Sequence, residues 1–130
     1  MAQEITSVAA RHILNYLMVS AGVTTPTRPT GWTMGIGTSI TNEALGQPSG
    51  SGYARQVVIF ASAASPGYTE NNVVVSFGPC SISAWGVVSC ADIQDHLNNV
   101  LWIGVLDTPR TIAIGDSLVF SVSTVHLSVT

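Results

Sequence analysis

The first twenty positions carry apolar side chains at helical spacing. Within residues 4–20, one stripe of a helix would hold Ile5, Val8, Ala9, His12, Ile13, Tyr16 and Leu17. Gly22 follows as a common helix end. The pattern predicts a helix over residues 4–20, which either covers an open face of the fold or docks on a neighbouring molecule. Ile13, Tyr16 and Leu17 are its candidate contact residues.

A connector and a series of short strands follow the helix. Residues 23–31 contain two prolines, which favour extended backbone. Beyond this connector, short runs rich in valine, isoleucine and threonine are typical of strands, and the polar segment 41–52 between two of them is expected to be a loop. We expect strands at residues 32–37, 53–63, 72–77, 85–93, 99–107, 111–114, 117–122 and 124–129.

The strand pattern determines the expected fold class. Apolar residues alternate with polar ones in the last two runs, as in half-buried strands: Leu118, Phe120 and Val122, then Val125, Leu127 and Val129. Many short strands of this kind are typical of an antiparallel sandwich or jelly roll. We expect a single all-β domain over residues 1–130: an antiparallel, jelly-roll-like β-sandwich at 32–130 with one N-terminal α-helix.

Composition narrows the function. Only 8% of the 130 residues are charged, the net charge is −3, and the chain has no lysine, so nucleic acid is not an expected partner. No apolar run is long enough for a transmembrane helix, and the opening residues do not resemble a signal peptide. With 46% hydrophobic residues, some of the surface is expected to be covered by partners.

Residues that could carry chemistry are few. Asp92, Asp95 and His96 bring two carboxylates and an imidazole within five residues, but a loop between two apolar strands requires such polar residues anyway. The loop interpretation is favoured, with an ion site as the alternative. His12 and His126 are expected to be ordinary packed or interface residues. We expect no catalytic residues, no metal and no cofactor.

Two cysteines, Cys80 and Cys90, flank Trp85. In a hairpin they would be able to form a disulfide, but free thiols are the favoured expectation in a chain without a secretion signal. Neither the spacing nor a neighbouring base indicates a catalytic thiol.

Arg55 stands at the start of a predicted strand. On a strand, Tyr53 and Arg55 share one face, and the two residues are expected to lie side by side. The guanidinium would then bind a carboxylate, for which Asp107 and Asp116 are the candidates. The favoured hypothesis is a structural joint that fastens the 41–52 loop to the sandwich. The alternative is an interface arginine that binds a neighbouring subunit.

Three segments carry a family resemblance: "GSGYARQVVIF", "TENNVVVSFGPCSISAWGVVSCADIQD" and "LDTPRTIAIGDSLVFSVSTVHLSVT". Together they resemble a family of small bacteriophage virion proteins, described as tail fibre or head decoration (cement) proteins. The matching positions are Gly52, Tyr53, Ala54, Arg55, Asn72, Phe77, Trp85, Gly86, Pro109, Arg110, Thr111, Gly115 and Asp116. The cysteine pair and the segment "DIQDHLNNVL" depart from the family pattern, so the role of that loop stays open.

The resemblance implies an all-β subunit without catalysis, located in the virion and assembled in the cytoplasm of the host bacterium. The favoured function is a capsid decoration subunit that binds itself, as a dimer or trimer, and the major capsid protein. The alternative is a tail or tail-fibre component that binds other tail proteins and contacts the host. A more distant alternative, from another class, is a carbohydrate-binding module with surface aromatic residues.

Overall fold

The computed structural model describes residues 2–17, 29–62 and 67–128. All strand pairs in these residues are antiparallel, and a single helix accompanies them, which confirms the all-β class with one helix. The elements are β1 (Ala2–Ile5), α1 (Ser7–Leu17), β2 (Trp32–Gly37), β3 (Ile40–Thr41), β4 (Ala44–Leu45), β5 (Gln56–Val58), β6 (Tyr68–Glu70), β7 (Val75–Phe77), β8 (Gly86–Asp95), β9 (Val100–Ile112), β10 (Leu118–Phe120) and β11 (His126–Ser128).

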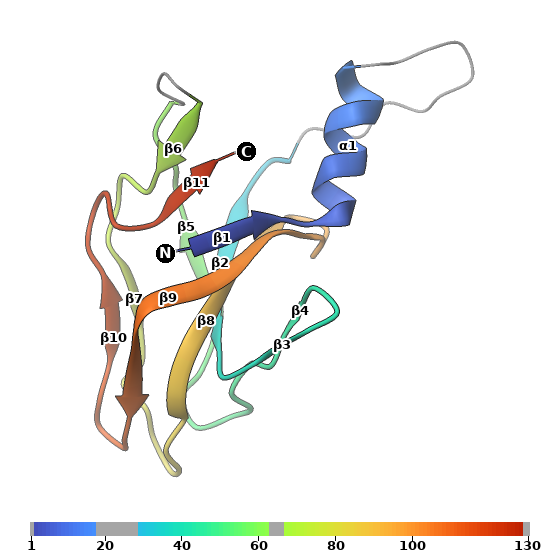
Figure 1. The fold of residues 1–130 in the computed structure, drawn as a ribbon. Coiled ribbons are helices and arrows are strands. Elements are labelled where there is room, and N and C mark those ends of the chain that lie inside the picture. The colour runs from blue at the N-terminus through green and yellow to red at the C-terminus, as the bar shows by residue number, and fades with distance from the viewer. Residues whose placement is uncertain (1, 18–28, 63–66, 129–130) are drawn as a thin grey trace.

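The strands form two layers around one apolar core (Figure 1). The first layer is a five-stranded sheet in the order β1-β9-β8-β2-β5, and the second is made by the pairs β10-β7 and β11-β6. Both layers supply fully buried side chains, among them Met34, Ile36 and Ile93 from the first and Phe77 and Leu127 from the second. This is the expected sandwich; its jelly-roll connectivity stays a prediction.

The five-stranded sheet is covered on both faces. Ile103 pairs with Asp92, so the two residues share the face turned away from the core, which we call the outer face. Leu101 and Ile103 are buried there, outside the main core, and α1 packs on their strand with Ala9 as its buried residue. The small hairpin β3-β4 packs on the same face against β8 and β9.

The helix begins later than its sequence pattern indicated. Residues 2–5 are not helical but form β1 at the sheet edge, where Ile5 pairs with Trp102. Thr6 then caps the helix: its Oγ1 accepts a hydrogen bond from Ala9 N at 3.2 Å and donates one to Val100 O at 2.6 Å. The apolar stripe extended through Ile5 because this residue stands at helical spacing from Ala9, although it belongs to the strand before the helix. Residues 18–20 of the predicted helix lie outside the described residues.

Two of the predicted strand boundaries are also corrected. The runs 99–107 and 111–114 were expected to be separate strands, yet β9 continues from Val100 to Ile112 through Pro109. The loop expected at 41–52 contains the hairpin β3-β4, whose two turn residues, Asn42 and Glu43, both have positive φ angles. Short strands with exposed side chains leave little periodic signal in the sequence.

The hairpin is tied to the helix by one carboxylate. Glu43 accepts hydrogen bonds from the Ser7 hydroxyl at 2.7 Å and from Ser7 N at 2.9 Å. These two bonds, the side-chain one first, hold the pKa of the Glu43 carboxyl below its usual range. The carboxylate also lies at the positive end of the helix dipole. Segments 36 residues apart in the sequence are thereby joined.

Thr6→Ala is expected to destabilise the chain by about 1–2 kcal/mol, because the helix loses its cap and Val100 O loses a donor. Urea unfolding followed by circular dichroism measures the change. Thr6→Ser is the matched control: it keeps the hydroxyl and should lose much less. Equal losses in the two variants would show that the methyl packing matters and the cap does not.

Candidate functional site

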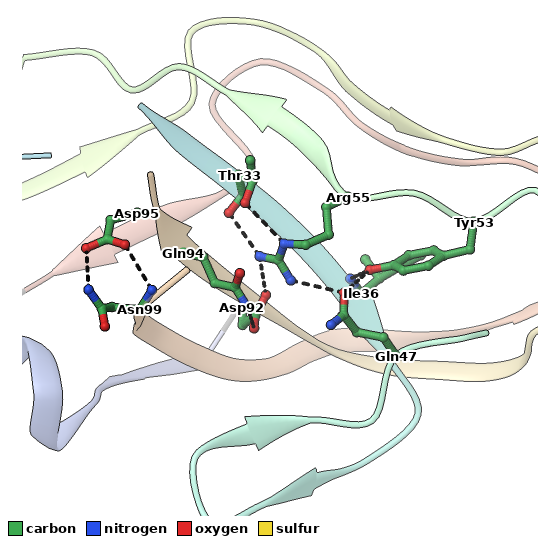
Figure 2. Close-up of polar contacts among 9 residues, drawn as sticks. All are labelled: Thr33, Ile36, Gln47, Tyr53, Arg55, Asp92, Gln94, Asp95 and Asn99. Atoms are coloured by element: carbon green, nitrogen blue, oxygen red, sulfur yellow. Dashed lines mark hydrogen bonds and ion pairs between the residues drawn. The ribbon is translucent and has the colours of Figure 1, made fainter. Parts of the chain in front are cut away.

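The site is built around Arg55, just before β5. Its side chain lies across β2 on the outer face and reaches β8 (Figure 2). Nε donates to Thr33 Oγ1 at 3.1 Å, Nη2 donates to Thr33 O at 3.2 Å, and Nη1 donates to Gln47 Oε1 at 3.1 Å. Nη2 also lies 2.7 Å from Asp92 Oδ1, an ion pair. The guanidinium therefore connects a loop and two strands of its own chain.

Gly35 makes this crossing possible. A Cβ atom built on Gly35 would stand 2.1 Å from Arg55 Nη1 and 2.8 Å from Asp92 Oδ1. Any side chain at this position would push the guanidinium off the sheet. Gly37, two residues further along the same face, leaves room in the same way for Leu45 of the hairpin and for Gly46, which follows it. The two alternate glycines thus leave the outer face of β2 without side chains at these positions, so Arg55 and the hairpin pack directly on the strand.

Asp92 is the buried partner of this ion pair, and its burial makes the pair important for stability. Its side chain is 1% exposed, whereas that of Arg55 is 20% exposed. Asp92 Oδ1 accepts no hydrogen bond of regular geometry from the described residues, although it forms the ion pair with the Arg55 guanidinium. Asp92 Oδ2 accepts a hydrogen bond from Gln94 Nε2 at 3.4 Å. The carboxylate is therefore compensated mainly by the positive charge of Arg55. Removing that charge would leave a buried anion without a counter-ion.

Tyr53 supports the same cluster. Its hydroxyl donates to Gln47 Oε1 at 2.6 Å and accepts from Ile36 N at 3.2 Å. Ile36 lies in the part of β2 beyond the three residues that pair with β5. Its ring stacks on Phe77 and meets Trp85 edge-on. Burial raises the pKa of Tyr53 above its ordinary value of 10.0, against smaller opposing effects of the Ile36 hydrogen bond and Arg55. The hydroxyl therefore stays a neutral donor over the physiological range.

The acid that meets Arg55 is Asp92, in place of the expected Asp107 or Asp116. Asp107 lies on β9, which β8 and β2 separate from β5. Asp116 closes its own turn, because its Oδ2 accepts a hydrogen bond from Ala113 N at 3.0 Å. The alternate glycines of "WTMGIG" were the available signal, since glycine inside a strand often marks a close approach of another group.

The remaining candidate contact residues divide between core and surface. Trp85 is buried, and its Nε1 donates to Ser51 O at 3.0 Å. Ile13 is half-buried on α1, whereas Tyr16 and Leu17 are exposed at its end. None of the described tryptophans is exposed, so among the described residues only tyrosines, Tyr16 and Tyr68, offer the exposed aromatic rings that the carbohydrate-binding alternative requires.

The cluster of Asp92, Asp95 and His96 is divided among separate tasks. Asp95 organises the β8–β9 turn: Oδ1 accepts from Leu97 N and Asn99 N, both at 2.9 Å, and Oδ2 accepts from Asn99 Nδ2 at 3.0 Å. Burial alone would raise the pKa of Asp95, but the hydrogen bonds from Asn99 and Leu97 bring it below its ordinary value. Within the described ranges, no group of three or more potential ligands is placed to hold a metal ion.

The other candidate groups take part in packing. Cys80 and Cys90 are buried free thiols, as expected, and burial raises the pKa of Cys90. His126 Nε2 lies 3.1 Å from Glu70 Oε2 across the β6–β11 pair, and His12 is half-buried on α1. No helix in the described part of the chain is long and apolar enough to cross a membrane.

The arrangement of these polar side chains is that of a scaffold, because they hold strands and turns of their own chain together. Residues 4–128 match the family model described as Podophage GP4 fiber I protein gp80. This match defines the class: the chain is a structural protein of a bacteriophage virion. It belongs to the podophage GP4 fiber I protein gp80 family, which confirms the resemblance to small phage virion proteins. No curated protein matches the chain.

Arg55→Ala is expected to destabilise the chain by about 3 kcal/mol at neutral pH, because Asp92 would stay buried without its counter-ion. Chemical denaturation measures the loss. Arg55→Lys keeps the charge but not the fork of donors, so an intermediate loss is expected. Adding Asp92→Asn to Arg55→Ala should recover most of the stability. A double variant as unstable as the sum of the two single changes would contradict the pairing.

Asp95→Asn is expected to cost about 1–2 kcal/mol at neutral pH, because Asn99 Nδ2 loses its carboxylate acceptor. The pKa of Asp95 is lower in the folded chain than the value of about 3.9 in an unfolded one. Its contribution is therefore complete above that value and is lost as the pH falls toward the folded-state pKa. Unfolding curves of both proteins between pH 7 and pH 2 should converge at the acid end. A gap that does not change with pH would refute this role.

Proposed function

We propose that the chain is a subunit of a phage fibre that works through contacts with other virion proteins. The single observation that carries this is the match of residues 4–128 to a family described as a fibre protein. The match covers both layers of the sandwich and α1, so the whole described fold corresponds to the family rather than one shared strand pair.

The distribution of polar groups supports a contact function. The buried acids serve the fold, since Asp92 pairs with Arg55 and Asp95 holds a turn. The surface, by contrast, carries many exposed apolar side chains, including Val57, Val74 and Val119. A chain with 8% charged residues and this much exposed valine has the composition of a protein covered by neighbours in its working state.

Location in the particle tests the proposal. Immunogold labelling of intact virions, combined with quantitative mass spectrometry of copy number, distinguishes a fibre subunit from the decoration subunit expected from the sequence. We expect label at the fibres and a low copy number, in proportion to the tail. Label spread over the head, with hundreds of copies, would replace the fibre role with the decoration role.

Loss of the protein gives an independent readout. Virions assembled without the chain should keep intact, filled heads and fail to adsorb to the host. Complementation with the wild-type chain should restore adsorption. Fragile or leaking heads with normal adsorption would contradict the fibre role.

A further inference from the structure

The strand β10 has an unprotected edge. It pairs with β7 alone, so within the described chain its other edge forms no ladder. Residues 117–125 contain no charged residue and no proline. Edge strands of monomeric proteins are usually protected by lysine, proline or a bulge, because a bare edge pairs with another strand. β10 has none of these three protections, and only its length of three residues limits its pairing with another strand.

A hollow of about 330 Å³ lies beside this edge. One wall is the end of β9, at residues 110–112, and the other is formed by residues 116–119, which lead into β10. The turn between the two strands closes with a hydrogen bond from Asp116 N to Ala113 O at 3.0 Å. Val119, which is 53% exposed, stands at this site on the side of β10 away from the core.

The hollow carries one charge of each sign. Arg110 is exposed, and its guanidinium makes no ion pair or hydrogen bond with any described residue; Asp116 is exposed on the facing wall. A surface with one cation and one anion is complementary to itself: a second copy turned by a two-fold axis places each acid toward the other copy's arginine. This charge arrangement and the uncharged edge point to the same occupant.

We propose that a second copy of the chain docks at this site. The β10 strands of the two copies pair antiparallel about a two-fold axis near Val119, and Arg110 of each copy faces Asp116 of the other. This joins the second layers of two sandwiches into one sheet. The inference deepens the proposed contact function by naming a partner, but its test uses the purified full-length chain and does not depend on where the chain lies in the virion.

Sedimentation equilibrium of the purified chain gives the first test. The wild type should be a dimer in which Val119→Lys raises the dissociation constant by about thirtyfold or more, as a central interface residue does. Val105→Lys is the matched control: Val105 is 50% exposed, but its strand is paired on both sides there. A wild-type monomer at every concentration, a trimer, or equal effects of the two lysines would overturn the proposal.

Complementation between charge variants gives the second test. Arg110→Asp and Asp116→Arg should each be monomeric, because like charges then face each other across the axis. An equimolar mixture should form a heterodimer, since both opposite-charge contacts return. Circular dichroism first verifies that Asp116→Arg folds without its hydrogen bond from Ala113 N. If it does not, Asp116→Asn replaces it; its mixture with Arg110→Asp restores one opposite-charge contact and should associate more tightly than Arg110→Asp alone. Association of either charge-reversal variant alone, as strong as the wild type, would overturn the proposal.

Discussion

The ion pair between Arg55 and Asp92 is the interaction on which the outer face of the sheet depends. It crosses three neighbouring strands of the sheet: Arg55 directly precedes β5, its side chain passes over β2, and Asp92 lies on β8. The carboxylate is almost entirely buried, so its desolvation is offset only while the guanidinium stays in place. The same guanidinium holds Gln47, and Gln47 also receives the Tyr53 hydroxyl. One charged group therefore sets the position of a loop, an aromatic ring and two strands.

Glycine is as important to this arrangement as the charges are. β2 presents Thr33, Gly35 and Gly37 to the outer face, which gives one hydrogen-bonding residue and two bare positions. Arg55 occupies the first bare position, and the β3-β4 hairpin occupies the second. The hairpin is in turn fixed to α1 through Glu43 and Ser7. The covering of the outer face is thus one connected structure from β5 to the helix.

The sequence predicts the strands that show a regular pattern of apolar residues, and it misses the features that depend on single contacts. Runs rich in valine and isoleucine indicated β8 and the start of β9, and alternation of apolar and polar residues indicated β10 and β11, because a strand half-buried on a core has a period of two. The same rule failed for β1, since four residues before a helix fit both periods. The role of Arg55 as a joint was inferred from its position, but its acid was misassigned. Asp92 lies 37 positions away, and only the strand order β5, β2, β8 brings the two together.

The use of charge explains why a contact function fits this chain. A soluble monomer ordinarily keeps its charged residues on the surface, where they oppose association. Here the few charges that the chain has are committed largely to its own structure, and the exposed strand β10 carries none. Surface association then costs little desolvation of charge, and valine side chains supply the apolar area. Arg110 stands apart from this pattern and lies with Asp116 at the open edge of β10, where opposite charges would set the register of a neighbouring strand.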